Sequence, residues 1–375
     1  MIKQSRGRGW SNFFGRDLGH AFVPWLLARV CVLGALAVAR YGLEDAHLRR
    51  PVQAKQGLFA WDAAYYRAIA ESGYQSGRNT LRFFPLVPLL SRWLGVVMFD
   101  HTAAALLVVA SVSALIFGAL LYALALRETG DQRLANRAAW FAAIFPPAMV
   151  LVLGYAEATL MALSVGMFIA LRSRRWALAA LLGVLAGLCR PIGVLLVIPA
   201  LIEAARHWQR IPRAERITRG AAVVSPLVGT GIFLAWAGGV YGDWLEPLRQ
   251  QTSKRLRGGF ENPGTRIGHA FGDLFGNKFG SGLHVVWALL FIVVIVVLAR
   301  RLPSSYAAYA AATVLLGLSA HNLDSFERYA MSAFPLALGV ALITGPEEVE
   351  KAALVLSAAG LIGYAMLAFL GVSVP

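Results

Sequence analysis

Residues 102–126 read TAAALLVVASVSALIFGALLYALAL, a run without Asp, Glu, Lys or Arg. A helix of about 20 apolar residues spans the hydrocarbon core of a bilayer, which is about 30 Å thick. The chain of 375 residues is 58% hydrophobic and 15% charged, whereas soluble chains are about 25% charged. Four further runs also lack these four residue types: 220–242, 302–323, 329–346 and 352–375. We therefore predict an all-α polytopic membrane protein.

Basic residues outnumber acidic residues by 35 to 20, which gives a formal net charge of +15. In a soluble chain this excess would indicate nucleic acid. Here the basic residues cluster at the ends of the apolar runs. Anionic lipid headgroups and the topology of the chain in the membrane account for such clusters. We expect membrane lipids as partners and no nucleic acid. Cys31 and Cys189 lie in apolar stretches and predict no disulfide.

The apolar pattern predicts about eleven membrane segments, within a range of about nine to thirteen. Two short runs, 176–189 and 192–204, are interpreted as a hairpin broken at Arg190-Pro191. This hairpin places the basic loops 172–175 and 203–219 on the same side of the membrane, as the positive-inside rule requires. The predicted segments are 22–40, 102–126, 138–153, 156–171, 176–189, 192–204, 220–240, 284–299, 303–320, 329–345 and 352–372.

The loop charges also predict an orientation in the cell membrane. The short basic loops face the cytoplasm, together with the N-terminus. The chain is then a single integral membrane domain, 1–375, with two long extracytoplasmic loops, 41–100 and 241–283. These outer loops and the outer ends of the segments contain the unusual polar residues of the chain, so the active site is expected to be extracytoplasmic.

The first outer loop contains Trp61-Asp62 at the start of a segment with apolar residues at helical spacing. We expect an amphipathic interfacial helix that ends at Gly73. Asp62 falls in its first turn, where the helix dipole favours a carboxylate whether or not the residue has a function. Downstream, Arg82 precedes the Phe83-Phe84-Pro85 segment, which reads as an interfacial turn or as a rigid rim beside a lipid-accessible groove.

Further ionisable residues fall at the predicted outer membrane ends. Charged groups near membrane depth are costly, so they face a cavity or one another and are functional candidates. The alternative is mutual neutralisation, of Glu157 by Arg190 or of Asp324 by Arg328. The candidates, with their polar neighbours, are Tyr155, Glu157, Arg190, His321, Asp324 and Arg328.

Several motifs are absent from the sequence. It has no Asp-x-Asp pair, no phosphate-binding G-x-x-x-x-G-K-[ST] loop, no H-E-x-x-H and no C-x-x-C. These absences argue against nucleotide hydrolysis and zinc chemistry. A transporter or lipid flippase stays open as an alternative, but such proteins place polar residues at mid-membrane in both halves, whereas here they gather at one face.

The ordered set of motifs resembles the GPI mannosyltransferase II (PIG-V) family. Trp61-Asp62 with its Tyr-rich helix and Phe83–Leu89 resemble the first luminal loop of that family. Gly154-Tyr155-Ala156-Glu157 resembles its Tyr-Ser-Glu segment, with Ala in place of Ser. The segments around Arg190-Pro191 and from Glu327-Arg328-Tyr329 to Phe334-Pro335 resemble its later motifs.

The resemblance implies a GT-C fold glycosyltransferase that takes a sugar from a polyprenyl-phosphate carrier and inverts the anomeric centre. It implies no cofactor and no necessary metal, and a polyprenyl-phosphate mannose donor. The acceptor does not carry over from the resemblance, and we expect a hydroxyl of a lipid-linked or glycan molecule. A GT-C enzyme with another polyprenyl-phosphate sugar is the alternative. The 30 Arg against 5 Lys indicate a bacterial chain, which would not make GPI anchors.

The resemblance makes Asp62 the expected catalytic base. His321 is expected to orient the acceptor or share its proton. We expect Arg328 to bind the donor phosphate, with Arg190 and Arg82 as further candidates, because a guanidinium binds phosphate oxygens in pairs. The expected supporting or acceptor-binding residues are Trp61, Tyr66, Tyr155, Glu157 and Asp324.

Overall fold

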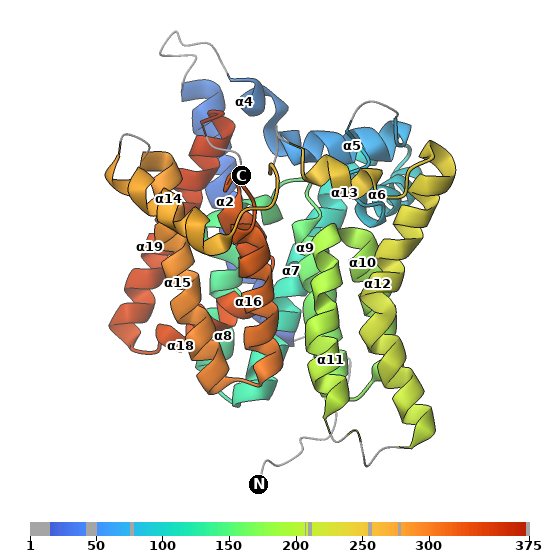
Figure 1. Ribbon diagram of the computed structural model, residues 1–375. Helices are drawn as coiled ribbons and strands as arrows, with labels where there is room; N and C mark the ends of the chain where they lie inside the picture. Colours follow the sequence, from blue (N-terminus) through green and yellow to red (C-terminus); the bar gives the residue numbers. More distant parts are fainter. Residues whose placement is uncertain are drawn as a thin grey trace.

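A computed structural model describes residues 16–42, 51–75, 79–206, 208, 212–253, 257–276 and 279–372. Within these ranges the chain is helical, and the β pairing consists of an isolated antiparallel bridge between Phe260 and Ala320. The predicted all-α fold is confirmed. Figure 1 shows a bundle of upright helices with shorter helices across its upper end.

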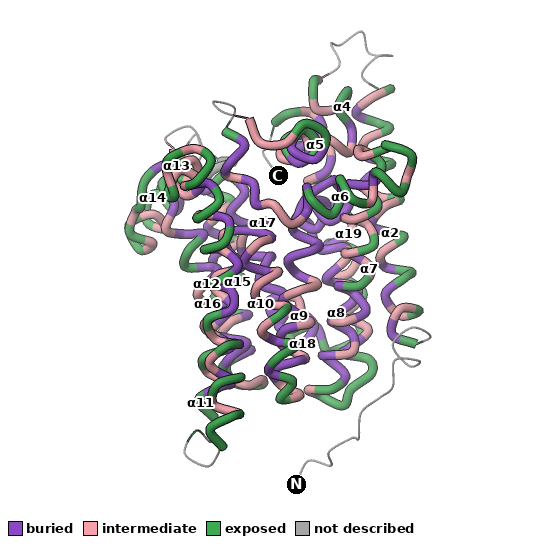
Figure 2. Tube along the Cα trace, turned by 90° about the vertical axis from the view of Figure 1, so that its right-hand side faces the viewer, coloured by how far each residue is buried: buried purple, intermediate pink, exposed green. Residues whose placement is uncertain are grey.

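The described residues contain five helices long and apolar enough to cross a membrane. Their outer faces carry the exposed Leu, Ile, Val and Phe side chains that a lipid environment accepts, while the buried residues lie inside the bundle (Figure 2). The multi-span prediction is confirmed, and the number eleven stays a prediction. The five helices are α2 (Leu18–Ala37), α7 (Thr102–Thr129), α12 (Arg213–Tyr241), α15 (Phe279–Arg301) and α19 (Glu347–Phe369).

Shorter helices fill the bundle between these five. Two predicted breaks are present: α10 ends at Cys189 and Arg190 is extended (φ −156°), and α9 begins at Glu157. Pro146 and Pro191 each begin a 3₁₀ helix, as expected for a residue that cannot donate a backbone hydrogen bond. The shorter elements are α8 (Gln132–Ile144), η4 (Pro146–Leu151), α9 (Glu157–Arg172), α10 (Trp176–Cys189), η5 (Pro191–Leu196), α11 (Val197–Ala205), α16 (Ser304–Leu318), α17 (Phe326–Met331) and α18 (Pro335–Ile343).

Helices α10 and α12 pack closely because glycines face each other at their crossing. A Cβ added to Gly187 would lie 2.2 Å from the carbonyl oxygen of Pro226, and one added to Gly229 would lie 2.0 Å from that of Val184. Small residues of this kind allow membrane helices to approach backbone to backbone. This crossing holds Arg190, at the end of α10, in place.

The two long loops contribute helices to the same end of the bundle, here called the site end (Figure 1). The predicted helix after Trp61 is present and ends at Gly73, whose φ of +78° favours glycine. Residues 86–97, which fall in the predicted outer loop 41–100, form a separate helix that a turn with positive φ at Phe99 and Asp100 divides from α7. The helices here are α4 (Val52–Gln56), η3 (Gly57–Phe59), α5 (Asp62–Ser72), α6 (Leu86–Val97), α13 (Glu246–Gln251) and α14 (Pro263–Phe275).

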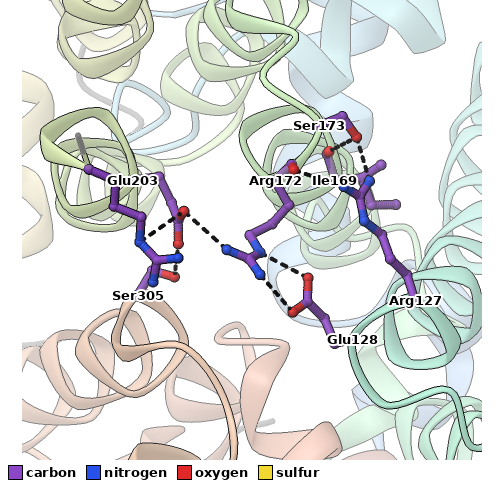
Figure 3. A network of polar contacts seen from close by, with 8 residues as sticks. Arg127, Glu128, Ile169, Arg172, Ser173, Glu203 and Ser305 are labelled. Atoms are coloured by element: carbon purple, nitrogen blue, oxygen red, sulfur yellow. Dashed lines mark hydrogen bonds and ion pairs between the residues drawn. The ribbon is translucent and has the colours of Figure 1, made fainter. Parts of the chain in front are cut away.

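At the opposite end, an ion-pair network ties four helices together (Figure 3). Arg172, at the end of α9, binds both carboxylate oxygens of Glu128 on α7, at 2.9 and 3.1 Å. Its other amino group donates to Glu203 on α11 at 3.3 Å, and Ser305 on α16 donates to the same carboxylate at 2.7 Å. Each charge has a partner, so the network reads as a structural tie.

Candidate active site

Asp62 sits at the first residue of α5, directly after a strained backbone position. Trp61 has φ +59° and ψ −127°, a conformation that non-glycine residues rarely adopt and that concentrates at functional sites. The indole of Trp61 donates to the carbonyl of Ala368 at the end of α19 (3.0 Å), and the backbone N–H of Asp62 donates to the Tyr155 hydroxyl (3.1 Å). These contacts fix the direction in which the Asp62 carboxylate points.

The Asp62 carboxylate begins a chain of alternating charges. Arg328 donates to one Asp62 oxygen at 2.8 Å, and Arg82 lies 3.8 Å from the other. Nε of Arg328 lies 3.5 Å from Glu157, and Arg190 contacts the same Glu157 oxygen at 2.5 Å. Residues more than 260 positions apart thus form one electrostatic unit.

Local backbone geometry brings the two central members of this unit together. Ser325 adopts a left-handed conformation (φ +64°) just before α17, which carries Arg328 into the bundle. Glu157 occupies the first turn of α9, where the helix dipole favours its charge. Both side chains are almost fully buried, and Figure 2 shows α17 within the bundle at its site end. Buried charges of this kind are tolerated because they are paired.

The arginines determine the protonation of Asp62. Burial raises the pKa of the Asp62 carboxyl, but the positive charges of Arg328, Arg82 and Arg190 lower it, and the net pKa is below its usual range. Asp62 is therefore a carboxylate at neutral pH.

A cavity of about 500 Å³ opens beside this carboxylate. Its volume is within the range of small-molecule sites, about 300–1,000 Å³. Aromatic rings form one wall, where Tyr65 stacks on Phe83 at 4.9 Å and Arg82 lies 4.6 Å from the Phe83 ring. The polar lining residues are Trp61, Asp62, Tyr65, Tyr66, Arg82, Arg190, Gln251, Thr252, Arg257, Asn322, Asp324, Ser325, Arg328 and Tyr329.

The structure brings most of the predicted site residues together here. Tyr155 and Glu157 lie buried behind the wall, in contact with Asp62, Arg190 and Arg328. The predicted neutralisation of Glu157 by Arg190 is present. The residues that line the cavity as expected are Trp61, Asp62, Tyr66, Arg82, Arg190, Asp324 and Arg328.

Two of the candidates, His321 and Asp324, lie differently from what the sequence suggested. His321 is not part of the lining: its ring is 75% exposed and its Nδ1 lies 3.0 Å from Glu261. His321 thus lies outside the lining of the cavity, and its expected role toward the acceptor stays a prediction. Asp324 accepts from the side chain of Asn322 at 2.8 Å, and Arg328 pairs with Asp62 and Glu157 instead, so Asp324 and Arg328 do not neutralise each other.

The sequence reasoning missed the contribution of the second long loop, from which Gln251, Thr252 and Arg257 enter the lining. One signal was available: Lys254, Arg255 and Arg257 form a basic cluster in a loop placed outside the membrane. The positive-inside rule leaves such a cluster unexplained, and this indicates an anionic ligand.

The arrangement can hold an anion beside an ionised carboxylate. Arginine clusters bind phosphate groups, and a carboxylate close by can accept a proton from a hydroxyl. The aromatic wall suits a ring-shaped or apolar substrate. This combination is typical of group transfer from a phosphate ester.

Residues 83–323 match glycosyltransferase family 87. Comparison with the curated proteins gives no match. Among solved structures, an oligosaccharyltransferase from Archaeoglobus fulgidus in complex with Zn and sulfate is 14% identical, with a TM-score of 0.47, and the match covers 92% of this chain and 52% of that one. The archaeal oligosaccharyltransferase from the same organism with an inhibitory peptide and a dolichol-phosphate is 12% identical (TM-score 0.46; 97% and 56% covered). The chain thus spans about half the length of these structures.

Proposed function

Because the chain belongs to glycosyltransferase family 87, and is thus a membrane glycosyltransferase, we propose that it is an inverting mannosyltransferase of the GT-C type. The proposed donor is polyprenyl-phosphate mannose, and the proposed acceptor is a hydroxyl of a lipid-linked or glycan molecule. The likeness of its motifs to GPI mannosyltransferase II supports mannose as the sugar. The family assignment disfavours the transporter alternative.

One observation carries this proposal: a carboxylate paired with arginines, Asp62, faces a cavity whose charged lining groups are mainly arginines. Asp62 and four arginines, Arg82, Arg190, Arg257 and Arg328, line the same space. A sugar joined to a lipid phosphate is already activated, so its transfer needs a base for the acceptor and cations for the leaving phosphate. The cavity supplies both kinds of group.

In the proposed reaction, the acceptor oxygen attacks C1 of the sugar while the bond from C1 to the phosphate oxygen breaks. The acceptor proton passes to Asp62, and the polyprenyl phosphate leaves with the electron pair of the broken bond. Attack on the face opposite the leaving group inverts C1. The arginines stabilise the negative charge that grows on the phosphate, and the reaction as written requires no metal.

The lowered pKa of Asp62 fits a late proton transfer. An ionised Asp62 can accept a hydrogen bond from the acceptor hydroxyl before reaction. The proton becomes acidic only as the new bond to C1 forms, so a weakly basic carboxylate is sufficient. We place this chemistry on the extracytoplasmic face, where both long loops gather.

The decisive test is transfer by the purified full chain in lipid nanodiscs. The protein is incubated with polyprenyl-phosphate mannose and a lipid extract of bacterial membranes, and products are identified by mass spectrometry. We expect an acceptor that gains one hexose, with release of polyprenyl phosphate. Glucose- and arabinose-bearing donors run in parallel decide the sugar. Absence of transfer from every polyprenyl-phosphate donor would overturn the proposal.

A further inference from the structure

Arg257 differs from the other arginines of the cavity in having no carboxylate partner among the described residues. Arg82, Arg190 and Arg328 each lie within 4 Å of Asp62 or Glu157. The guanidinium of Arg257 instead lies 3.5 Å from the centre of the Tyr329 ring. Its Nε is buried without a hydrogen-bond partner, as is the Nε of each of the other three, so the missing carboxylate is what sets Arg257 apart. A buried donor without a partner costs free energy unless a ligand satisfies it.

The charges around the cavity do not balance. Four arginines line it, whereas the nearby carboxylates are Asp62 and Asp324 in the lining and Glu157 behind it. Among the described residues one positive charge is left over, and a sugar phosphodiester carries one negative charge. The pKa of Arg257 points the same way, because burial lowers it and the positive charges of Arg328 and Arg190 lower it further. A bound anion would relieve both effects.

Backbone pairing holds Arg257 at the cavity. The carbonyl of Arg257 accepts from the N–H of Asn322 at 3.0 Å, and the N–H of His321 donates to the carbonyl of Gly259 at 3.2 Å. Gly258 has φ +70°, and a Cβ there would lie 2.8 Å from Cβ of His321, so this close approach requires glycine. The exposed His321 is thus a backbone partner of the strap, here defined as residues 257–261.

From these observations we infer that Arg257 binds the phosphate of the polyprenyl-phosphate donor, with Tyr329 positioning its guanidinium. This inference rests on the proposed function, because it identifies the main phosphate contact of that donor. Arg328 and Arg190 are held by Asp62 and Glu157 before substrate arrives. Arg257 has no such competitor, so it can bind phosphate without breaking an ion pair.

The test measures binding of polyprenyl phosphate, which lacks the sugar, and of the neutral polyprenol of equal chain length to the full chain in nanodiscs. We expect wild type to prefer the phosphate. Arg257→Gln should bind polyprenyl phosphate about tenfold more weakly than wild type or weaker still, roughly the effect of losing one charge-assisted contact. Its affinity for polyprenol should be unchanged. Arg257→Lys should recover part of the loss.

Arg249→Gln is the matched control, because Arg249 lies in the same loop, is 57% exposed, pairs with Asp243 and Glu246, and is not part of the lining. It should bind both lipids as wild type does. Equal phosphate affinity of Arg257→Gln and wild type would overturn the role of Arg257 alone. Failure of wild type to prefer the phosphate would overturn the proposed function itself.

Discussion

At the scale of single residues, Asp62 is the group on which turnover depends. Asp62→Asn keeps the shape of the side chain and can still accept from Arg328, but it cannot take a proton. We expect kcat for sugar transfer to fall by about three orders of magnitude, as when a general base is lost, while donor affinity changes little. Glu71→Gln is the matched control, since Glu71 lies on the same helix and is paired with exposed Arg67. An Asp62→Asn enzyme with wild-type kcat would rule Asp62 out as the base.

The same residue predicts the response of the enzyme to acid. Its pKa is lowered in the folded protein, so the ion pair with Arg328 is complete above the unfolded value of about 3.9 and is lost as the pH falls through the folded pKa. We therefore expect no loss of kcat/KM from Asp62 between about pH 8 and pH 5. A pH profile of turnover in nanodiscs checks this. An acid limb centred near about pH 6 would contradict the assignment of an arginine-paired Asp62 as the base.

At the scale of the elements, the junction of η3 and α5 is held by the Trp61 indole. Trp61→Phe keeps an aromatic ring and removes only the hydrogen bond to Ala368. We expect a loss of stability of about 1 kcal/mol, the net value of one hydrogen bond, and a larger effect on kcat, about tenfold, because Asp62 follows directly. Thermal unfolding and steady-state kinetics on the same samples separate the two. If the fall in kcat is no larger than the loss of folded protein accounts for, the junction does not position Asp62 for catalysis.

The ion pair of Glu157, at the start of α9, with Arg190, at the end of α10, predicts an effect on stability. Glu157→Gln leaves Arg190 buried without its counter-charge, and removal of one partner of a buried pair costs about 3–5 kcal/mol. Glu157→Gln with Arg190→Met removes both charges and should recover much of the melting temperature. Thermal unfolding in detergent measures both variants. A double variant no more stable than the single one would show that the pair does not join these helices energetically.

Much of the helix pattern could be predicted, because it follows from hydropathy and loop charge. The range 176–189 coincides with α10, and the break at Arg190-Pro191 follows from the basic loops on either side. The separate helix α6 could not be predicted in this way, because an apolar stretch beginning at Pro85 reads equally as an interfacial helix or as the approach to a span. Only the reversal at Phe99 and Asp100 divides it from α7.

The membership of the site was easier to predict than its pairing. Asp62, Arg190 and Arg328 share one face in the topology that the loop charges predict, so the sequence places them at the same end of the bundle. Which arginine binds which carboxylate depends on side-chain positions within about 1 Å, and sequence patterns do not contain this information. Arg257 was missed because a strap without periodic structure gives no helical or strand pattern to locate it.

At the scale of the whole molecule, the two ends have different chemistry, and this predicts an orientation. The site end carries the cavity, and the opposite end carries the paired network around Arg172. In a background without Cys31 and Cys189, Phe260→Cys tests the site end, since Phe260 is 82% exposed, and Arg175→Cys tests the turn between α9 and α10.

A membrane-impermeant maleimide should label Phe260→Cys in intact cells and Arg175→Cys only after the membrane is opened, because the basic turn faces the cytoplasm under the positive-inside rule. Retained sugar transfer by both variants controls for correct folding. The reverse labelling pattern would place Asp62 and its arginines at the cytoplasmic surface. The extracytoplasmic reaction would then be wrong, while the geometry of the site would stand.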